Sequence, residues 1–140
     1  MAQFDLHTKV AATPALNIQA ISTDTKTVGN IIDTALFESL EFVLFSGTIT
    51  TGVFTPLLEE GDLPALGDAA PVDAGFILGT YALATFTTAA ADDNACKQLG
   101  YIGKKRYVRL SIVTTSTGNG TIGAVAVEGN LKSSSIDANT

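Results

Sequence analysis

The chain has 140 residues, of which 46% are hydrophobic and 16% charged, and its formal net charge is −6. A chain of this length suits a single domain that buries roughly 68–70% of its unfolded surface, so a core is feasible without metals or disulfides. Eight basic residues against fourteen acidic ones argue against binding to nucleic acids or to anionic membranes, both of which depend on Lys and Arg.

The first 15 residues mix polar and apolar side chains without a period, so we expect residues 1–15 to form an extended N-terminal arm. From Leu16 the pattern alternates and predicts a first strand, which is followed by a polar loop over Ser22–Asn30. No basic and apolar leader and no apolar run near the roughly 18 residues of a membrane span is recognisable. We therefore expect a protein that folds in the cytoplasm.

The segment Ser39–Thr50 alternates in polarity. Leu40, Phe42 and Leu44 share one side, while the other side carries Val43 and Phe45. Apolar residues on both sides predict a central strand that is covered on both faces. Thr50-Thr51-Gly52 is expected to make a hairpin turn into a partner strand.

A second clear strand is predicted at Tyr107–Val113, where Val108, Leu110 and Ile112 fall on one side. Gly118-Asn119-Gly120 then has the composition of a hairpin turn before a last strand. Short strands separated by turn signals predict an all-β fold, a single-domain antiparallel β-sandwich of jelly-roll type. We place this domain at residues 16–130 and expect a flexible C-terminal tail at residues 131–140.

Candidate chemical motifs all have simpler interpretations. Gly118–Gly123 matches the dinucleotide pattern G-x-G-x-x-G, but no helix follows it to receive a pyrophosphate. His7 lies in the predicted arm without a partner, and Cys96 is interpreted as a small buried hydrophobe. The acidic runs Glu59–Asp62 and Asp92–Asn94 lack the ligand spacing of a calcium loop and are interpreted as solvated turns. We expect no catalytic residue, no metal and no cofactor, and hence no enzyme.

Three passages carry a family resemblance: Ile32–Val43, Ser46–Leu57 and Leu99–Leu110, with Gly123–Val127 as a closing fourth. In these passages the chain resembles a family of small virion proteins of tailed bacteriophages that are associated with the head and are found near the major capsid gene. The motifs specify strands and turns. The family usually has an acidic residue before the glycine of the first turn, where this chain has Thr51.

The resemblance implies a capsid decoration, or cement, protein that binds and stabilises the lattice of the major capsid protein. It implies a homo-oligomer, with a trimer favoured over a dimer, located on the capsid exterior of the virion. A structural protein of the tail or of the head–tail connector is one alternative. A β-sandwich module that binds carbohydrate for host attachment is another, although the chain has no Trp for an aromatic platform.

Contacts with the capsid or between subunits are expected from two segments. Apolar side chains on the arm gain little in solvent but are favourable in a groove of a partner. The basic triplet before Tyr107 is either an exposed strand end or a grip on an acidic neighbour. The predicted interface residues are Phe4, Leu6, Val10, Lys104, Lys105 and Arg106.

Overall fold

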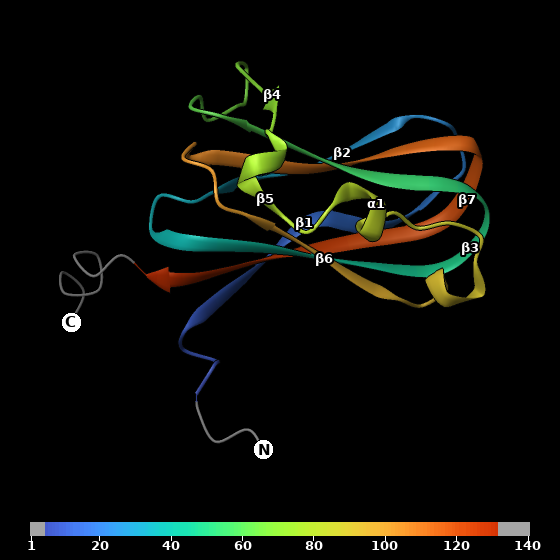
Figure 1. Cartoon of the computed structure of the whole chain (residues 1–140), viewed down its shortest axis with the longest axis horizontal. Helices are drawn as coiled ribbons and strands as arrows, with labels where there is room; N and C mark the ends of the chain where they lie inside the picture. Colours follow the sequence, from blue (N-terminus) through green and yellow to red (C-terminus); the bar gives the residue numbers. More distant parts are fainter. Residues whose placement is uncertain (1–4, 132–140) are drawn as a thin grey trace.

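The computed structural model describes residues 5–131 and shows an antiparallel β-sandwich with little helix (Figure 1). The predicted fold class is confirmed. The only α-helix of this part of the chain is α1 (Tyr81–Ala84), and 3-10 turns span Ala74–Phe76 and Ala90–Asp92. The strands are β1 (Val10–Ile21), β2 (Lys26–Asp33), β3 (Phe37–Gly61), β4 (Ala70–Pro71), β5 (Ile77–Leu78), β6 (Cys96–Tyr101) and β7 (Tyr107–Leu131).

Two strands of 25 residues each, β3 and β7, pair antiparallel from one end to the other. Both bend midway, at the right-hand end of Figure 1, so that the two strands cross together from one layer to the other. The lower layer holds β1, the second half of β7, the first half of β3, β6 and β5. The upper layer holds β2, the first half of β7, the second half of β3 and β4. The sandwich is therefore one sheet folded on itself.

The bend explains two turns that the sequence analysis placed wrongly. Thr50–Gly52 and the segment 118–120 do not reverse the chain; they lie opposite each other in neighbouring strands, where Thr51 pairs with Asn119. The ladder is irregular here, and Gly52, Ser116 and Thr117 have φ angles of 91°, 62° and 58°. Bulges that contain residues with positive φ angles bend a strand and increase its twist. Turn-forming residues that lie opposite each other in β3 and β7 therefore bend the two paired strands together.

The predicted core is confirmed in full. Leu40, Phe42 and Leu44 point inward from the lower layer, and all three are at most 5% exposed. The inward side chains of the upper layer that the alternation predicted are completely buried; they are Val108, Leu110 and Ile112. Period-two alternation is thus sufficient to place the core of these strands.

The sheet begins earlier than the sequence analysis placed it. Val10 already pairs with Gly129, so residues 10–15 of the segment predicted as an arm belong to β1. Register shifts between Pro14 and Leu16 and between Leu16 and Gln19 interrupt the alternation, which is why the pattern was not visible. At the other end β7 continues to Leu131, and residues 132–140 lie outside the described residues.

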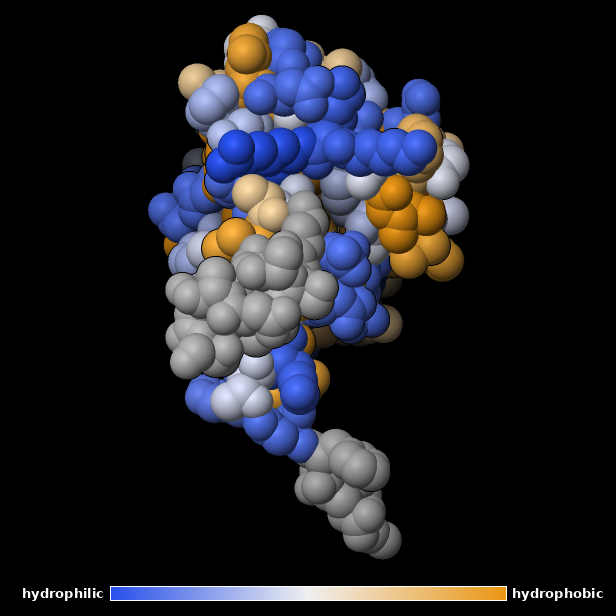
Figure 2. Space-filling view, turned by 90° about the vertical axis from the view of Figure 1, so that its left-hand side faces the viewer, coloured by the Kyte–Doolittle hydropathy of each residue, from blue (hydrophilic) through white to orange (hydrophobic). Residues whose placement is uncertain are grey.

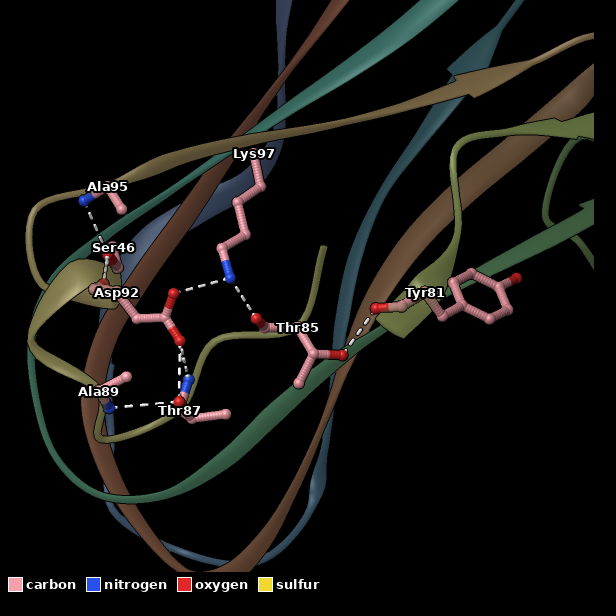
Figure 3. A network of polar contacts seen from close by, with 8 residues as sticks. All are labelled: Ser46, Tyr81, Thr85, Thr87, Ala89, Asp92, Ala95 and Lys97. Carbon is pink, nitrogen blue, oxygen red and sulfur yellow. Dashed lines mark hydrogen bonds and ion pairs between the residues drawn. The ribbon is translucent and has the colours of Figure 1, made fainter. Parts of the chain in front are cut away.

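The segment between β4 and β6 contains only short elements and packs against the core between the two layers. Phe86 is completely buried and forms an isolated bridge with Phe54. Figure 3 shows the polar contacts that hold this segment: Asp92 forms an ion pair with Lys97 at 2.8 Å and accepts hydrogen bonds from Thr87. Burial would raise the pKa of Asp92, but these hydrogen bonds outweigh it and the pKa lies below its usual value. The Lys97 ammonium also lies 4.8 Å from the centroid of the Phe86 ring.

The close approach at the bend gives a first prediction. A Cβ on Gly52 would lie 2.3 Å from the Cα of Gly118, and the φ of 91° is unfavourable for other residues. We expect Gly52→Ala to lower the free energy of unfolding by at least the roughly 1–3 kcal/mol that such a φ angle costs. The measurement is urea unfolding followed by circular dichroism. The control is Gly75→Ala, because a Cβ on Gly75 meets no atom within 4 Å. Equal midpoints for the two variants would show that the bend tolerates a side chain.

Candidate functional site

The predicted interface residues of the N-terminal segment do not form one group. Phe4 lies outside the described residues. Leu6 is 67% exposed and precedes the sheet, whereas Val10 is half-buried and begins β1. His7 is exposed nearby, as expected. Val10 is therefore a sheet residue, and only Leu6 keeps the environment that was predicted for it.

The basic triplet lies in the loop between β6 and β7, at the end of the sandwich that Figure 1 shows on the left. All three side chains are exposed. Lys105 forms an ion pair with Asp62 at 2.6 Å, and Arg106 binds both carboxylate oxygens of Asp33 at 2.9 Å. Exposed ion pairs contribute little stability. The charges of Lys105 and Arg106 are thus already matched by carboxylates of the same chain.

A groove of about 440 Å³ runs between this loop and the turn that joins β2 to β3. Its floor is fixed by hydrogen bonds, because the backbone N–H of Thr34 donates to the Arg106 carbonyl at 2.9 Å. The Tyr101 hydroxyl donates to Glu60 and accepts from the backbone N–H of Lys105 at 3.1 Å. Burial, together with the carboxylate of Glu60, raises the pKa of Tyr101 well above its usual value. Figure 2 looks onto this end and shows mainly hydrophilic residues in its upper part, with separate hydrophobic patches beside them.

Between the layers, Glu128 carries an unusual carboxylate. It is 5% exposed, and no described residue forms a hydrogen bond with its Oε2 atom. Burial raises the pKa of Glu128, and the negative charge of Asp33 raises it further. A buried polar group without a partner costs about 1–3 kcal/mol. The charged form of Glu128 therefore destabilises the fold.

The outer surface of the lower layer, here called the apolar face, is the largest feature that the sequence analysis missed. Residues directly opposite one another in a ladder share a face. The pairs Val43–Val125 and Phe45–Gly123 therefore place their side chains on the outside of this layer. The nonpolar members of the face are Val10, Ala12, Pro14, Ile18, Val43, Phe45, Leu78, Val125 and Val127.

No layer of the described chain covers this face. Val43 and Phe45 were predicted to be covered, but they are only half-buried, and Ile18 is 68% exposed. A shallow groove of about 320 Å³ lies between Ile18, Phe45 and Val125. The signal was present in the sequence as a second apolar side of the segment Ser39–Thr50, but alternation alone does not tell whether another layer covers that side.

Cys96 also lies on this face, opposite Phe45, and it is exposed. Its interpretation as a buried hydrophobe was wrong, because the inward positions of β6 are taken by the alternate residues Lys97, Leu99 and Tyr101. A lysine is normally expected on the outside of a sheet, so the alternation did not indicate that Lys97 points inward. Its charge is matched inside the fold by Asp92. The error is therefore a shift of one residue in the facing of β6.

The outer surface of the upper layer, here called the charged face, combines a cluster of ion pairs with apolar side chains, among them Val28 and Ile31, which are 52% and 37% exposed. At its centre Glu59 forms ion pairs with Lys26 at 2.8 Å and with Arg109 at 3.2 Å. Burial would raise the pKa of Glu59, but the hydrogen bonds and charges of Lys26 and Arg109 lower it below its usual value. Glu59 is 7% exposed, so its interpretation as part of a solvated turn was wrong. The difference arises because β3 extends to Gly61.

Other chemistry is sparse in the part of the chain that the structure describes. No group of three or more His, Cys, Asp or Glu side chains is placed to hold a metal ion within residues 5–131. Within the same range, no helix has the length and apolar character that crossing a membrane requires. Asp92–Asn94 forms a turn, as expected, but Asp92 is not solvated, because its carboxylate pairs with Lys97 inside the fold. The side chain of Asp93 accepts a hydrogen bond from the backbone N–H of Ile49 at 2.8 Å.

Comparison with known proteins gives distant structural similarities alone. No protein-family model and no curated protein matches the chain. Among solved structures, it is similar to a chain of the "Structure of infectious bursal disease virus Gx strain", with 16% sequence identity and a TM-score of 0.46. The match covers 85% of this chain and 32% of that chain, so this chain spans well under half of its length. A similarity of this size does not assign a function.

The unpaired carboxylate gives a second prediction. Because the pKa of Glu128 is raised in the folded state, wild-type stability should fall as the pH rises from the ordinary glutamate value of 4.5 through the raised folded value. Glu128→Gln removes the charge but keeps a polar group, so we expect the variant to be more stable than the wild type at pH 7 by about 1 kcal/mol, the order of the extra cost of an unpaired buried charge over a neutral polar group. The advantage should shrink towards pH 4.

Urea unfolding at a series of pH values between 4 and 7 checks this prediction. The control is Glu38→Gln, which removes the same charge at an exposed position. Parallel stability curves for Glu128→Gln and the wild type over the whole range would contradict the argument.

Proposed function

We propose that this protein is a structural protein of a virion that docks onto a protein lattice through its apolar face. More specifically, we propose a decoration protein of a tailed bacteriophage that binds and stabilises the shell of the major capsid protein. The single observation that carries the proposal is the contrast between the two outer faces. Both faces carry half-buried and exposed apolar side chains, but only the upper one has a cluster of matched charges among them, whereas the apolar face is almost without charge.

Such a contrast suits a subunit that sits on a surface. Contiguous exposed apolar patches commonly mark sites of interaction with other proteins. The groove of about 320 Å³ makes the face uneven, so a partner with a matching shape can pack closely against it. The charged face, with Lys26, Glu59 and Arg109 at its centre, is suited to solvent. The resemblance in Ile32–Val43, Ser46–Leu57 and Leu99–Leu110 is what directs the proposal to a phage capsid.

The rest of the structure is compatible with this role. The segments that carry the resemblance supply β3, β6 and the start of β7, which form the centre of the fold. A rigid sandwich loses little conformational entropy when it binds. Several copies on one shell, or a trimer as the resemblance implies, would strengthen attachment through effective concentration. The proposed location is the exterior of the capsid.

Substitutions on the two faces test the proposal, because β7 contributes a half-buried valine to each. Val125 lies on the apolar face and Val113 on the charged face, opposite Thr55. We expect Val125→Lys to abolish binding to capsids that lack the protein, because a lysine there places a charge in the contact. Val113→Lys should bind as the wild type does. The measurement is the number of copies that cosediment with capsids, and thermal unfolding confirms that both variants fold.

The copy number separates the alternatives. Hundreds of copies on heads agree with decoration, whereas a few copies on tails indicate a tail or connector protein. Binding to glycans without binding to virions indicates a host-attachment module. Equal loss of capsid binding in both lysine variants would mean that the apolar face has no special role.

A further inference from the structure

Glu41 is the one charged side chain on the apolar face as the described ladders define it. It lies on β3 between Val127 of β7 and Gly100 of β6. A groove of about 220 Å³ surrounds it, with Val10, Leu78 and Val127 among its walls. This groove is distinct from the one beside Ile18 and Phe45.

Gly100 makes the space that the carboxylate occupies. A Cβ on Gly100 would lie 2.7 Å from Oε2 of Glu41 and 2.9 Å from Cβ of Leu78. The carboxylate therefore lies over the backbone of Gly100, beside the apolar side chain of Leu78. Any larger residue in place of Gly100 would displace it.

No residue of the described chain forms a hydrogen bond or an ion pair with Glu41. Its counterpart on the charged face, Glu59, has two cationic partners at 2.8 and 3.2 Å. Burial among apolar neighbours raises the pKa of Glu41, whereas the net effect on Glu59 is a lowered pKa. The two carboxylates lie near opposite ends of β3, one on each outer face, but only Glu59 is matched within the fold.

We infer that the groove around Glu41 receives a lysine or arginine side chain of the protein onto which the apolar face docks. The inference rests on the proposed function for the identity of that protein, the capsid lattice. Covering the apolar face removes water from the carboxylate, and an unpaired charge in such a contact is costly. A cation on the partner restores the lost interactions and fixes the register of docking.

A second copy of the chain does not fit this face with two-fold symmetry. A two-fold contact places the same patch of both subunits together. Each Glu41 would then meet either the other Glu41 or an uncharged part of the same face, because the described ladders place no Lys or Arg on it, so neither carboxylate would gain a cation. The complementary occupant is an apolar surface of another protein that carries one basic side chain opposite Glu41.

The first test uses the intact protein and n-butylguanidinium, which combines a guanidinium group with a short apolar chain. We expect saturable shifts of the amide resonances of Gly100 and Val127 in NMR spectra. Glu41→Gln should abolish these shifts, since it keeps the shape and removes the charge. Asp73→Asn, which removes an exposed carboxylate outside the lining of this groove, should retain them. No saturable shift in the wild type, or equal shifts in Glu41→Gln, would overturn the inference.

The second test measures binding of the same variants to capsids that lack the protein. We expect Glu41→Gln to weaken binding at least tenfold and Asp73→Asn to leave it unchanged. If the wild type binds capsids and Glu41→Gln binds equally well, the inference is wrong and the proposed function stands. If the groove takes the guanidinium probe but the wild type does not bind capsids, the proposed function is wrong and the cation site stands.

Discussion

The fold depends on one constraint, which is that two 25-residue strands bend together at the same level without breaking their pairing. If β3 bent alone, its ladder with β7 would be lost and buried backbone groups would lack hydrogen bonds. The bend is possible because the backbones of Gly52 and Gly118 approach each other without side chains between them. The carboxylate of Asp24, from the β1–β2 connection, accepts hydrogen bonds from the backbone N–H groups of Thr117 and Gly118 at 2.9 and 2.8 Å. This contact satisfies two donors that the irregular ladder leaves without partners.

The arrangement of the two outer faces follows from the bend. The pair of β3 and β7 is folded once. One side of these two strands is therefore buried between the layers, and the other side faces outward in both layers. The same strand therefore carries both outer faces: β7 contributes Arg109 and Ser111 to one and Val125 and Val127 to the other. A difference in sequence between the two halves of a single strand is sufficient to make the two faces different.

Sequence reasoning was effective where a local pattern determines the outcome. Alternation at Leu40–Leu44 and at Val108–Ile112 located the core without error, because the period of a strand fixes which side chains share a face. It failed where the outcome depends on a neighbour far along the chain. Thr50–Gly52 has the composition of a turn, and only its position opposite residues 118–120 makes it a bend. Val43 and Phe45 have the composition of buried residues, and only the absence of a covering layer over the described strands makes them a surface.

The candidate site shows the same division. The exposure of Lys104, Lys105 and Arg106 followed from their place before a strand. The pairing of Lys105 with Asp62 and of Arg106 with Asp33 depends on how the connections pack at one end of the sandwich. Glu41 and Glu59 are similar in sequence context, each in an alternating strand, and nothing local indicates that only one is matched by cations. The central proposal is that the apolar face is the docking face, and the orientation of the protein on the capsid that we propose it decorates tests this most directly. A cryo-EM reconstruction of the decorated capsid should show β1, β3, β6 and the second half of β7 facing the shell, with β2 and the charged face towards solvent. Density in which the charged face or the end loops contact the shell, and the apolar face is open to solvent, would contradict the account.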